Sequence, residues 1–322
     1  SLLYSVLRES LMKVAVIGST SWGTTLGIIL ARREIDVALW ARTSEEAVRL
    51  AEDRENTIRL PGIPFPKRLS PTSVREEALH NASLVLLAVP SQQMRQNVRI
   101  LRSEIAEGVP IVHAAKGLET GTAKRMTQII AEELDPRYIS TICVLSGPNL
   151  SKEIARGLPA ATVIAARDGR VAERVREIMD SASFHVFTSE DVVGVELGGA
   201  LKNIIALGAG MVDGLGYGDN AKAAYMSRGL TEIAGLGVAL GADPITFLGL
   251  AGLGDLLATC ASTLSRNHTL GEELAKGRSK DEVMKVLGSA VEGVPTTAAA
   301  MKLAGELRID MPITEHIYRV LF

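Results

Sequence analysis

The sequence is poor in the residues that mark several functional classes. It has two cysteines, Cys143 and Cys260, and neither these nor its five histidines show metal-ligand spacing, so we expect no metal site and a reducing, cytoplasmic compartment. Aromatic residues make up only 4% of the chain, and the formal net charge is −2. These values argue against base-stacking surfaces and against a basic field that would attract nucleic acid. An anionic ligand would therefore need a local binding site.

Long apolar runs and targeting signals are also missing. Charged residues interrupt every apolar run before the ~18 residues that a membrane helix needs, so we expect no membrane insertion. The first eleven residues contain Arg8 and Glu9 and lack a signal-peptide pattern, and we expect Met12 to be the natural start. The 322-residue chain has 47% apolar and 22% charged residues, which is typical of a globular protein of two domains.

The first half of the chain alternates apolar strands with helices. Residues 13–17 predict a strand that ends at Gly18, residues 21–32 a helix, and residues 35–40 a second strand, which together form a βαβ unit. Further strands are expected at 84–89, 111–115, 141–146, 161–166 and 184–187, with a helix at 170–179. The pattern predicts an α/β fold with a Rossmann-type, doubly wound sheet over residues 12–189.

A glycine-containing turn, residues 18–23, joins the first strand to the first helix. It has the first and third glycines of the fingerprint G-x-G-x-x-G, Gly18 and Gly23, but Thr20 takes the place of the second. The helix N-terminus can still bind a dinucleotide phosphate through backbone N–H groups and the helix dipole. A tight turn that binds no ligand is the alternative.

The end of the second strand indicates which dinucleotide is bound. NAD-specific sites place an acidic residue there for the ribose hydroxyls, whereas this chain has Arg42. An arginine suits a 2′-phosphate, so we predict that NADP(H) is favoured over NAD(H). A solvent-exposed arginine without a ligand is the alternative.

Other strand ends carry further candidates, because ligands of open α/β sheets bind at the carboxyl ends of the strands. Pro90 and Lys116 each follow an expected strand and are placed to line the cleft. A lysine there can bind an anion or polarise a carbonyl, although a surface lysine fits the position equally well. The turn at 147–151 opens another helix at the same edge.

The second half, residues 190–322, predicts helices only, with long ones at 192–213 and 220–240. The 192–213 stretch contains five glycines, which indicates that another element packs close to its backbone. Its interior carries only two charges, Glu196 and Lys202. A lysine that loses solvation in such a helix becomes a proton donor and acceptor near neutral pH. The alternative is that Lys202 extends to the surface.

Four more residues in this half could bind a ligand or take part in catalysis. Asp255 follows three closely spaced glycines and could bind a substrate hydroxyl, orient Lys202, or cap a helix. Arg266 and Asn267 at an expected helix N-terminus could bind a phosphate, with capping by Asn267 as the alternative. Glu292 precedes a turn and could accept hydrogen bonds from a nicotinamide amide or a ribose, unless it is a solvated loop residue.

Together these pieces resemble the bacterial-type NAD(P)-dependent glycerol-3-phosphate dehydrogenases, from Lys13 to Phe322. The matching motifs, in chain order, are residues 18–23, 60–62, 88–91, 116–119, 146–148, 201–203, 252–255, 265–267 and 291–293. Nine motifs in the family's order make the resemblance specific. This chain departs from the family pattern at Thr20, Asn149 and Ser151. The family pattern also implies a further helix beyond Phe322.

The resemblance implies a role for each candidate. Lys202 matches the catalytic lysine, which accepts the proton during alcohol oxidation. The implied substrate-binding residues are Lys116, Gly147, Asn149, Lys202, Asp255, Ser265, Arg266 and Asn267. The implied cofactor-binding residues are Gly18, Ser21, Trp22, Gly23, Arg42, Pro90, Lys116, Ser151, Arg266 and Glu292.

The implied reaction is hydride transfer between C2 of sn-glycerol 3-phosphate and the nicotinamide of NADP(H) or NAD(H), which gives dihydroxyacetone phosphate and in reverse supplies phospholipid synthesis. Two other interpretations remain open, a related dehydrogenase of hydroxy acids and a cofactor-binding sensor without turnover. The apolar helical half favours a homodimer.

Overall fold

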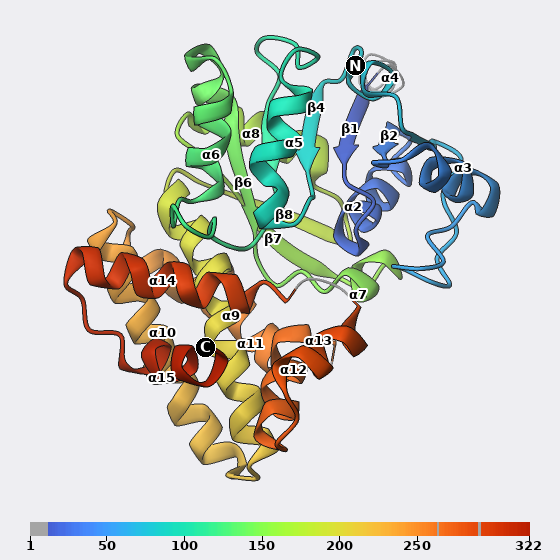
Figure 1. Cartoon of the computed structure of the whole chain (residues 1–322). Coiled ribbons are helices and arrows are strands. Elements are labelled where there is room, and N and C mark those ends of the chain that lie inside the picture. The colour runs from blue at the N-terminus through green and yellow to red at the C-terminus, as the bar shows by residue number, and fades with distance from the viewer. Residues whose placement is uncertain (1–11, 263, 289–290) are drawn as a thin grey trace.

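The computed structural model describes residues 12–262, 264–288 and 291–322. The first half is an eight-stranded sheet in the order β3-β2-β1-β4-β5-β6-β7-β8, flanked by helices, and the second half is helical (Figure 1). The predicted fold class is therefore confirmed. The segment before Met12, for which we expected no signal peptide, lies outside the described residues.

All neighbouring strands run parallel except β6 and β7, which are antiparallel. The strands are β1 Lys13–Ile17, β2 Asp36–Trp40, β3 Leu69–Thr72, β4 Leu84–Leu87, β5 Ile111–His113, β6 Ile142–Ser146, β7 Ala160–Ala166 and β8 Phe184–Ser189. Sequence analysis missed β3, which contains Pro71; an edge strand tolerates a proline because one side needs no ladder hydrogen bond. The predicted ranges of β4 and β5 were also too long, because the apolar residues that follow these strands pack into the buried clusters without extending the sheet.

The sheet is buried on both faces. Along β1, Val14 and Val16 join the apolar cluster on one face, while Ala15 and Ile17 join the cluster on the other. This is why its central strands read as continuous apolar runs. The helices of this half are α2 Ser21–Ala31, α3 Ser44–Asp53, α4 Arg75–Leu79, η1 Ser91–Gln93, α5 Met94–Leu101, α6 Met126–Glu133, η2 Pro136–Thr141, α7 Ser151–Ala155 and α8 Gly169–Met179.

Helix α9, Val192–Gly214, is the axis of the helical half and begins beside the lower edge of the sheet in Figure 1. The helices around it and beyond are α10 Gly218–Ala239, η3 Pro244–Leu248, η4 Leu250–Gly254, α11 Asp255–Ala261, α12 Arg266–Ala275, α13 Lys280–Leu287, α14 Gly293–Leu307 and α15 Pro312–Leu321. A Cβ on Gly210 would lie 2.0 Å from the carbonyl oxygen of His268, and one on Gly271 would lie 1.8 Å from that of Leu207. The expected close packing against the α9 backbone is therefore confirmed.

By length and composition alone, α9 is apolar enough to cross a membrane, with a mean hydropathy of 1.4. The expectation that charges break up every such stretch was wrong here, because two charges do not offset so many apolar neighbours. However, 94% of this apolar window is buried inside the protein. Such burial is typical of a core helix.

Candidate active site

Two lysines from different halves of the chain meet at one carboxylate. Lys116 follows β5, and its Nζ donates a hydrogen bond of 2.6 Å to Oδ2 of Asp255. Lys202 projects from α9, and its Nζ lies 3.1 Å from Oδ1 of the same side chain. Lys202 is 6% exposed and Asp255 is 2% exposed. Lys202 therefore does not extend to the surface, and the expectation that this lysine loses its solvation in α9 is confirmed.

Asp255 does not cap a helix. It is the first residue of α11, whose N-cap is Gly254, and the π-helical turn η4 leads into it. Thr259, one helical turn later, accepts a hydrogen bond of 2.5 Å from Lys202 Nζ and donates one of 3.2 Å to Asp255 Oδ1. Sequence analysis missed Thr259, although its i, i+4 spacing from Asp255 on a helix could have indicated it.

Burial perturbs the charge of Lys116. Desolvation lowers the pKa of Lys116 to about 8, aided by the charge of Lys202 and opposed by that of Asp255. The side chain of Lys116 as a whole is 17% exposed, while its Nζ is bonded to Asp255 and to the carbonyl of Gly147. Lys116, for which the sequence predicted anion binding or polarisation of a carbonyl, is therefore a lysine whose charge changes near pH 8.

Hydrogen bonds of two asparagine side chains connect the helical half to the segment that carries Lys116. Asn203 Nδ2 donates to the carbonyl of Lys116 over 3.0 Å, and Asn267 Nδ2 donates to Asn203 Oδ1 over 2.9 Å. Oδ1 of Asn267 in turn accepts from the backbone N–H of Gly293 over 2.9 Å. These bonds leave Asn267 one amide hydrogen for a ligand.

The expected anion site lies at the start of α12. Arg266 is the first residue of this helix and is exposed. The N-cap is Ser265, whose Oγ accepts from the backbone N–H of His268 over 3.3 Å. Capping by Asn267 is therefore wrong, because its side chain is turned toward Asn203.

The turn after β6 approaches the lysines through its backbone. The carbonyl of Gly147 accepts a hydrogen bond of 2.8 Å from Lys116 Nζ. Nδ2 of Asn149 donates to Thr162 Oγ1 over 3.1 Å, and its Oδ1 is buried with no partner among the described residues. Ser151 begins α7, where its carbonyl accepts from Thr25 Oγ1 over 3.2 Å. Gly147 is thus at the lysine pair, whereas Asn149 and Ser151 are held by neighbouring elements.

The turn between β1 and α2 has the shape of a phosphate cradle. Gly18 has a φ of +108°, and a Cβ on Gly23 would lie 2.0 Å from the carbonyl oxygen of Gly18. Thr20 caps α2: its Oγ1 accepts from Gly23 N over 3.0 Å and donates to the Ala88 carbonyl over 2.8 Å. Thr20, the residue that departs from the fingerprint, is therefore the N-cap of α2.

The remaining cofactor candidates surround this turn. Ser21 Oγ donates to the carbonyl of Arg59 over 2.5 Å. Trp22 packs against Phe184 with ring centroids 6.3 Å apart, and its Nε1 is buried without a partner among the described residues. Arg42 is exposed just beyond β2, where a ligand could reach it.

Glu292 connects the two halves across the cleft. Its carboxylate accepts from the backbone N–H of Ser91 over 3.1 Å and also from the Ser91 hydroxyl. Pro90 precedes Ser91 and is the N-cap of η1. Glu292 is therefore not a solvated loop residue, since it pairs with Ser91, the first residue of η1.

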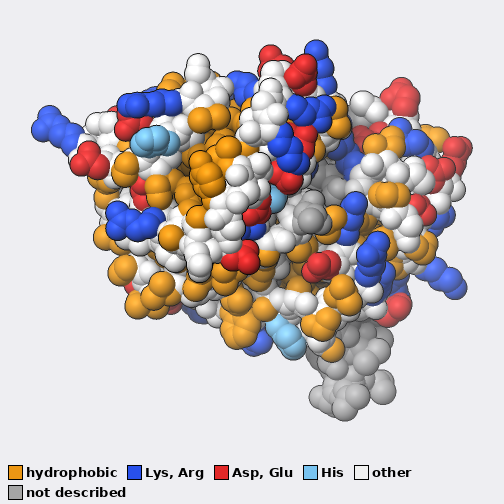
Figure 2. Space-filling model, turned by 90° about the horizontal axis from the view of Figure 1, so that it is seen from below, with side chains coloured by type: hydrophobic (Ala, Val, Ile, Leu, Met, Phe, Trp, Pro, Cys, Tyr) orange, Lys and Arg blue, Asp and Glu red, His pale blue; other side chains and the backbone are white. Residues whose placement is uncertain are grey.

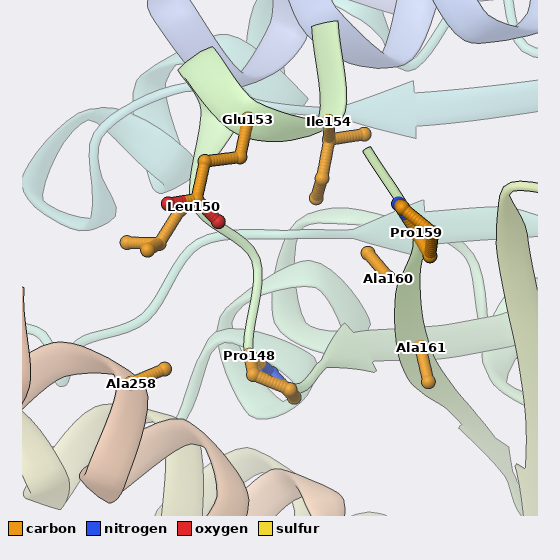
Figure 3. A pocket seen from close by; sticks show the side chains of 8 residues that line it. All are labelled: Pro148, Leu150, Glu153, Ile154, Pro159, Ala160, Ala161 and Ala258. Carbon is orange, nitrogen blue, oxygen red and sulfur yellow. The ribbon is translucent and has the colours of Figure 1, made fainter. Parts of the chain in front are cut away.

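A groove of about 260 Å³ lies between α7, β7 and α11 (Figure 3). Its lining is mostly apolar, with Glu153 as its single charged side chain. The residues that line it are Pro148, Leu150, Glu153, Ile154, Pro159, Ala160, Ala161 and Ala258. None of the expected site residues lines this groove, although Pro148 and Ala258 adjoin Gly147 and Thr259 in the sequence.

A doubly wound sheet with a phosphate cradle, joined to a helical half that brings a buried lysine to the strand ends, defines a dinucleotide-dependent dehydrogenase. Residues 13–172 match the family described as NAD-dependent glycerol-3-phosphate dehydrogenase N-terminus, and residues 191–322 match the corresponding C-terminus. The chain belongs to this family.

Individual relatives agree over nearly the whole chain. A glycerol-3-phosphate dehydrogenase [NAD(P)+] of Dehalococcoides mccartyi is 53% identical over 96% of this chain and 87% of its own length. One of Moorella thermoacetica is 48% identical over 98% and 92%. A crystal structure of glycerol-3-phosphate dehydrogenase from Coxiella burnetii matches with a TM-score of 0.91 and 34% identity, covering 96% of this chain and 94% of that one.

Proposed function

We propose that this protein interconverts sn-glycerol 3-phosphate and dihydroxyacetone phosphate with a nicotinamide dinucleotide. The observation that carries the proposal is the pair of lysines, Lys116 and Lys202, held at one carboxylate where the helical half meets the sheet. Membership of the family supports it. The test is a steady-state assay of NADPH and NADH oxidation with dihydroxyacetone phosphate, with pyruvate and other keto acids as competitors; turnover with keto acids alone would contradict the proposal.

Lys202 is the proposed catalytic residue. A dinucleotide bound at the Gly18–Gly23 turn would supply the hydride for the C2 carbonyl carbon of dihydroxyacetone phosphate in the reductive direction. The ammonium of Lys202 gives its proton to the resulting alkoxide, and in oxidation the neutral amine takes the proton back. Lys116 stabilises the negative oxygen with its charge. Asp255 compensates the charge of both lysines in the buried site.

The proposed phosphate anchor is the N-terminus of α12. Arg266 supplies a charged fork, and Ser265 and Asn267 lie beside it. A phosphate held there fixes the reacting carbon at a set distance from the lysines, which saves entropy at the reaction step. We propose Lys116, Gly147, Asn149, Lys202, Asp255, Ser265, Arg266 and Asn267 as the substrate-binding set.

The cradle at Gly18 and Gly23 fits a pyrophosphate, because a side chain at either glycine would meet backbone atoms. We propose Gly18, Ser21, Trp22, Gly23, Arg42, Pro90, Lys116, Ser151, Arg266 and Glu292 as the cofactor-binding set. NADP(H) is proposed as the favoured dinucleotide because of Arg42. The domain division proposed is 12–189 for the dinucleotide and 190–322 for the substrate.

A homodimer is proposed from apolar residues exposed on the helical half. Figure 2 shows the helical end of the molecule, where apolar side chains gather among charged ones. The exposed large apolar residues of this half include Leu215, Tyr217, Ile245, Leu248 and Val286. Light scattering should give twice the chain mass of 34.3 kDa, and the mass of one chain would contradict a dimer. We also propose a cytoplasmic enzyme, not inserted in a membrane, that supplies glycerol phosphate for phospholipids.

A further inference from the structure

One face of α9 holds both ends of the segment that follows β5. Glu196 and Asn203 lie two helical turns apart, so they share a face of α9. Asn203 binds the carbonyl of Lys116, and Glu196 binds Arg125 and Thr127 at the far end of the same segment. The segment that carries Lys116 is therefore fixed at two points to the helix that carries Lys202.

The carboxylate of Glu196 caps a helix that belongs to the other half of the chain. Its Oε1 accepts from the backbone N–H of Thr127, in the first turn of α6, over 2.8 Å. Its Oε2 accepts from Thr127 Oγ1 over 2.6 Å and from Arg125 Nη1 over 2.7 Å. An anion at a helix N-terminus is also stabilised by the helix dipole.

This contact is deeply buried and charged. The side chain of Glu196 is 1% exposed, and Nε2 of the buried His113 lies 3.3 Å from Oε1. Desolvation raises the pKa of Glu196, but His113, Arg125 and Thr127 outweigh it, so the pKa falls to about 2. The carboxylate is therefore charged at neutral pH, and removing its charge leaves Arg125 without its buried partner.

The segment itself packs into the helical half. Leu118 and Ala123, between the two anchored ends, are buried and belong to the apolar cluster formed around α9. Neither residue belongs to the sheet-side clusters. Gln92 and Arg95 of the sheet half also bind the middle of this segment, at the Leu118 carbonyl and the Glu119 carboxylate, whereas its two ends are held by α9.

We propose that Glu196 is a positioning residue for the reaction, which sets the separation of the Lys116 and Lys202 amines by holding this segment against α9. The inference rests on the proposed roles of those two lysines. Glu196 touches neither substrate nor cofactor in this account. A displacement of about 1 Å at a reacting centre can lower a rate roughly 100-fold, so a remote anchor can control turnover.

The test compares two carboxylates with the same kind of contact. Glu232 on α10 accepts from the backbone N–H groups of Ile313 and Thr314 and from the Thr314 hydroxyl, over 2.7 to 2.8 Å. It therefore caps α15 as Glu196 caps α6, but within the helical half. Glu232→Gln is the matched control for Glu196→Gln, since both remove one capping charge and keep the side-chain size.

We expect Glu196→Gln to lower kcat with dihydroxyacetone phosphate between about 10-fold and 100-fold, with an unchanged Kd for NADPH by fluorescence titration. Glu232→Gln should lower the unfolding temperature but leave kcat and KM unchanged. If Glu196→Gln does not fold, Thr127→Val removes one of the same hydrogen bonds and should lower kcat in the same direction.

An unchanged kcat in the folded Glu196→Gln variant, or an equal loss of kcat in Glu232→Gln, would overturn the proposal. With Glu196→Gln unfolded, an unchanged kcat in Thr127→Val would do so. Failure of the proposed function has a different signature, because the wild-type protein itself would then show no turnover with dihydroxyacetone phosphate.

Discussion

Lys116 and Lys202 lie on different halves of the chain, and each reaches a different oxygen of the Asp255 carboxylate, at 2.6 Å and 3.1 Å. Two ammonium groups this close repel each other, and the shared carboxylate offsets that repulsion in a buried site. The relationship couples the charge of one lysine to that of the other. It also means that the reacting geometry exists only when the two halves are correctly joined.

The pH profile should report Lys116. Its pKa is lowered to about 8, so it loses its charge as the pH rises through that value, and kcat/KM for the reduction should fall above it. Lys116→Arg keeps a permanent charge and should remove this basic limb, although with a lower maximum rate. A profile of kcat/KM against pH for both proteins is the measurement; an identical basic limb in the two would show that another group causes it.

The same pKa shift has a consequence for stability. Because the pKa of Lys116 lies below its ordinary value of 10.5, the unfolded chain binds more protons than the folded one between those two pH values. The contribution of this residue to the free energy of unfolding should therefore rise with pH across that window.

Asp255→Asn removes the carboxylate charge that raises the pKa of Lys116. The variant should therefore move the basic limb of the kcat/KM profile to lower pH.

Arg42 should determine the choice of dinucleotide. Arg42→Asp places an acceptor for ribose hydroxyls where the 2′-phosphate would bind, so the ratio of kcat/KM for NADPH to that for NADH should fall. The control is Arg32→Asp, which makes the same charge change at an exposed position after α2. Equal ratios in the wild type and Arg42→Asp would remove Arg42 from the cofactor site.

The glycines of the helical half should differ sharply in their tolerance of a side chain. Gly210→Ala would place a Cβ 2.0 Å from the carbonyl of His268, so we expect the free energy of unfolding to fall by about 1–3 kcal/mol. Gly235→Ala on α10 meets nothing within 4 Å and should raise it by about 0.5–1 kcal/mol. Urea denaturation of both variants is the measurement, and equal effects would contradict the close approach of α9 and α12.

Local pattern was enough to predict the fold class, the first βαβ unit and the long apolar helix. The same pattern placed Lys116 just after a strand, because the hydrophobic pattern of each strand depends only on the residues of that strand. Strand β3 was not predicted because Ser70 and Pro71, at the edge of the sheet, interrupt its apolar pattern.

Contacts between distant segments could not be predicted in the same way. That Asp255 serves both lysines depends on the π-helical turn before it and on how α11 packs against α9. The pairing of Glu292 with Ser91 spans 201 positions of sequence. Such contacts are set by tertiary packing, so the residue types were predictable as polar candidates but their partners were not.

The central claim is that the amine of Lys202 exchanges the proton with the substrate oxygen. The direct test is Lys202→Ala, assayed for NADPH oxidation with dihydroxyacetone phosphate and titrated with NADPH by fluorescence. Lys222→Ala, which removes a lysine paired with Asp213 elsewhere in the helical half, is the control. The account predicts a loss of turnover of about 10²- to 10⁴-fold with NADPH binding unchanged; a folded Lys202→Ala protein that turns over at the wild-type rate would contradict it.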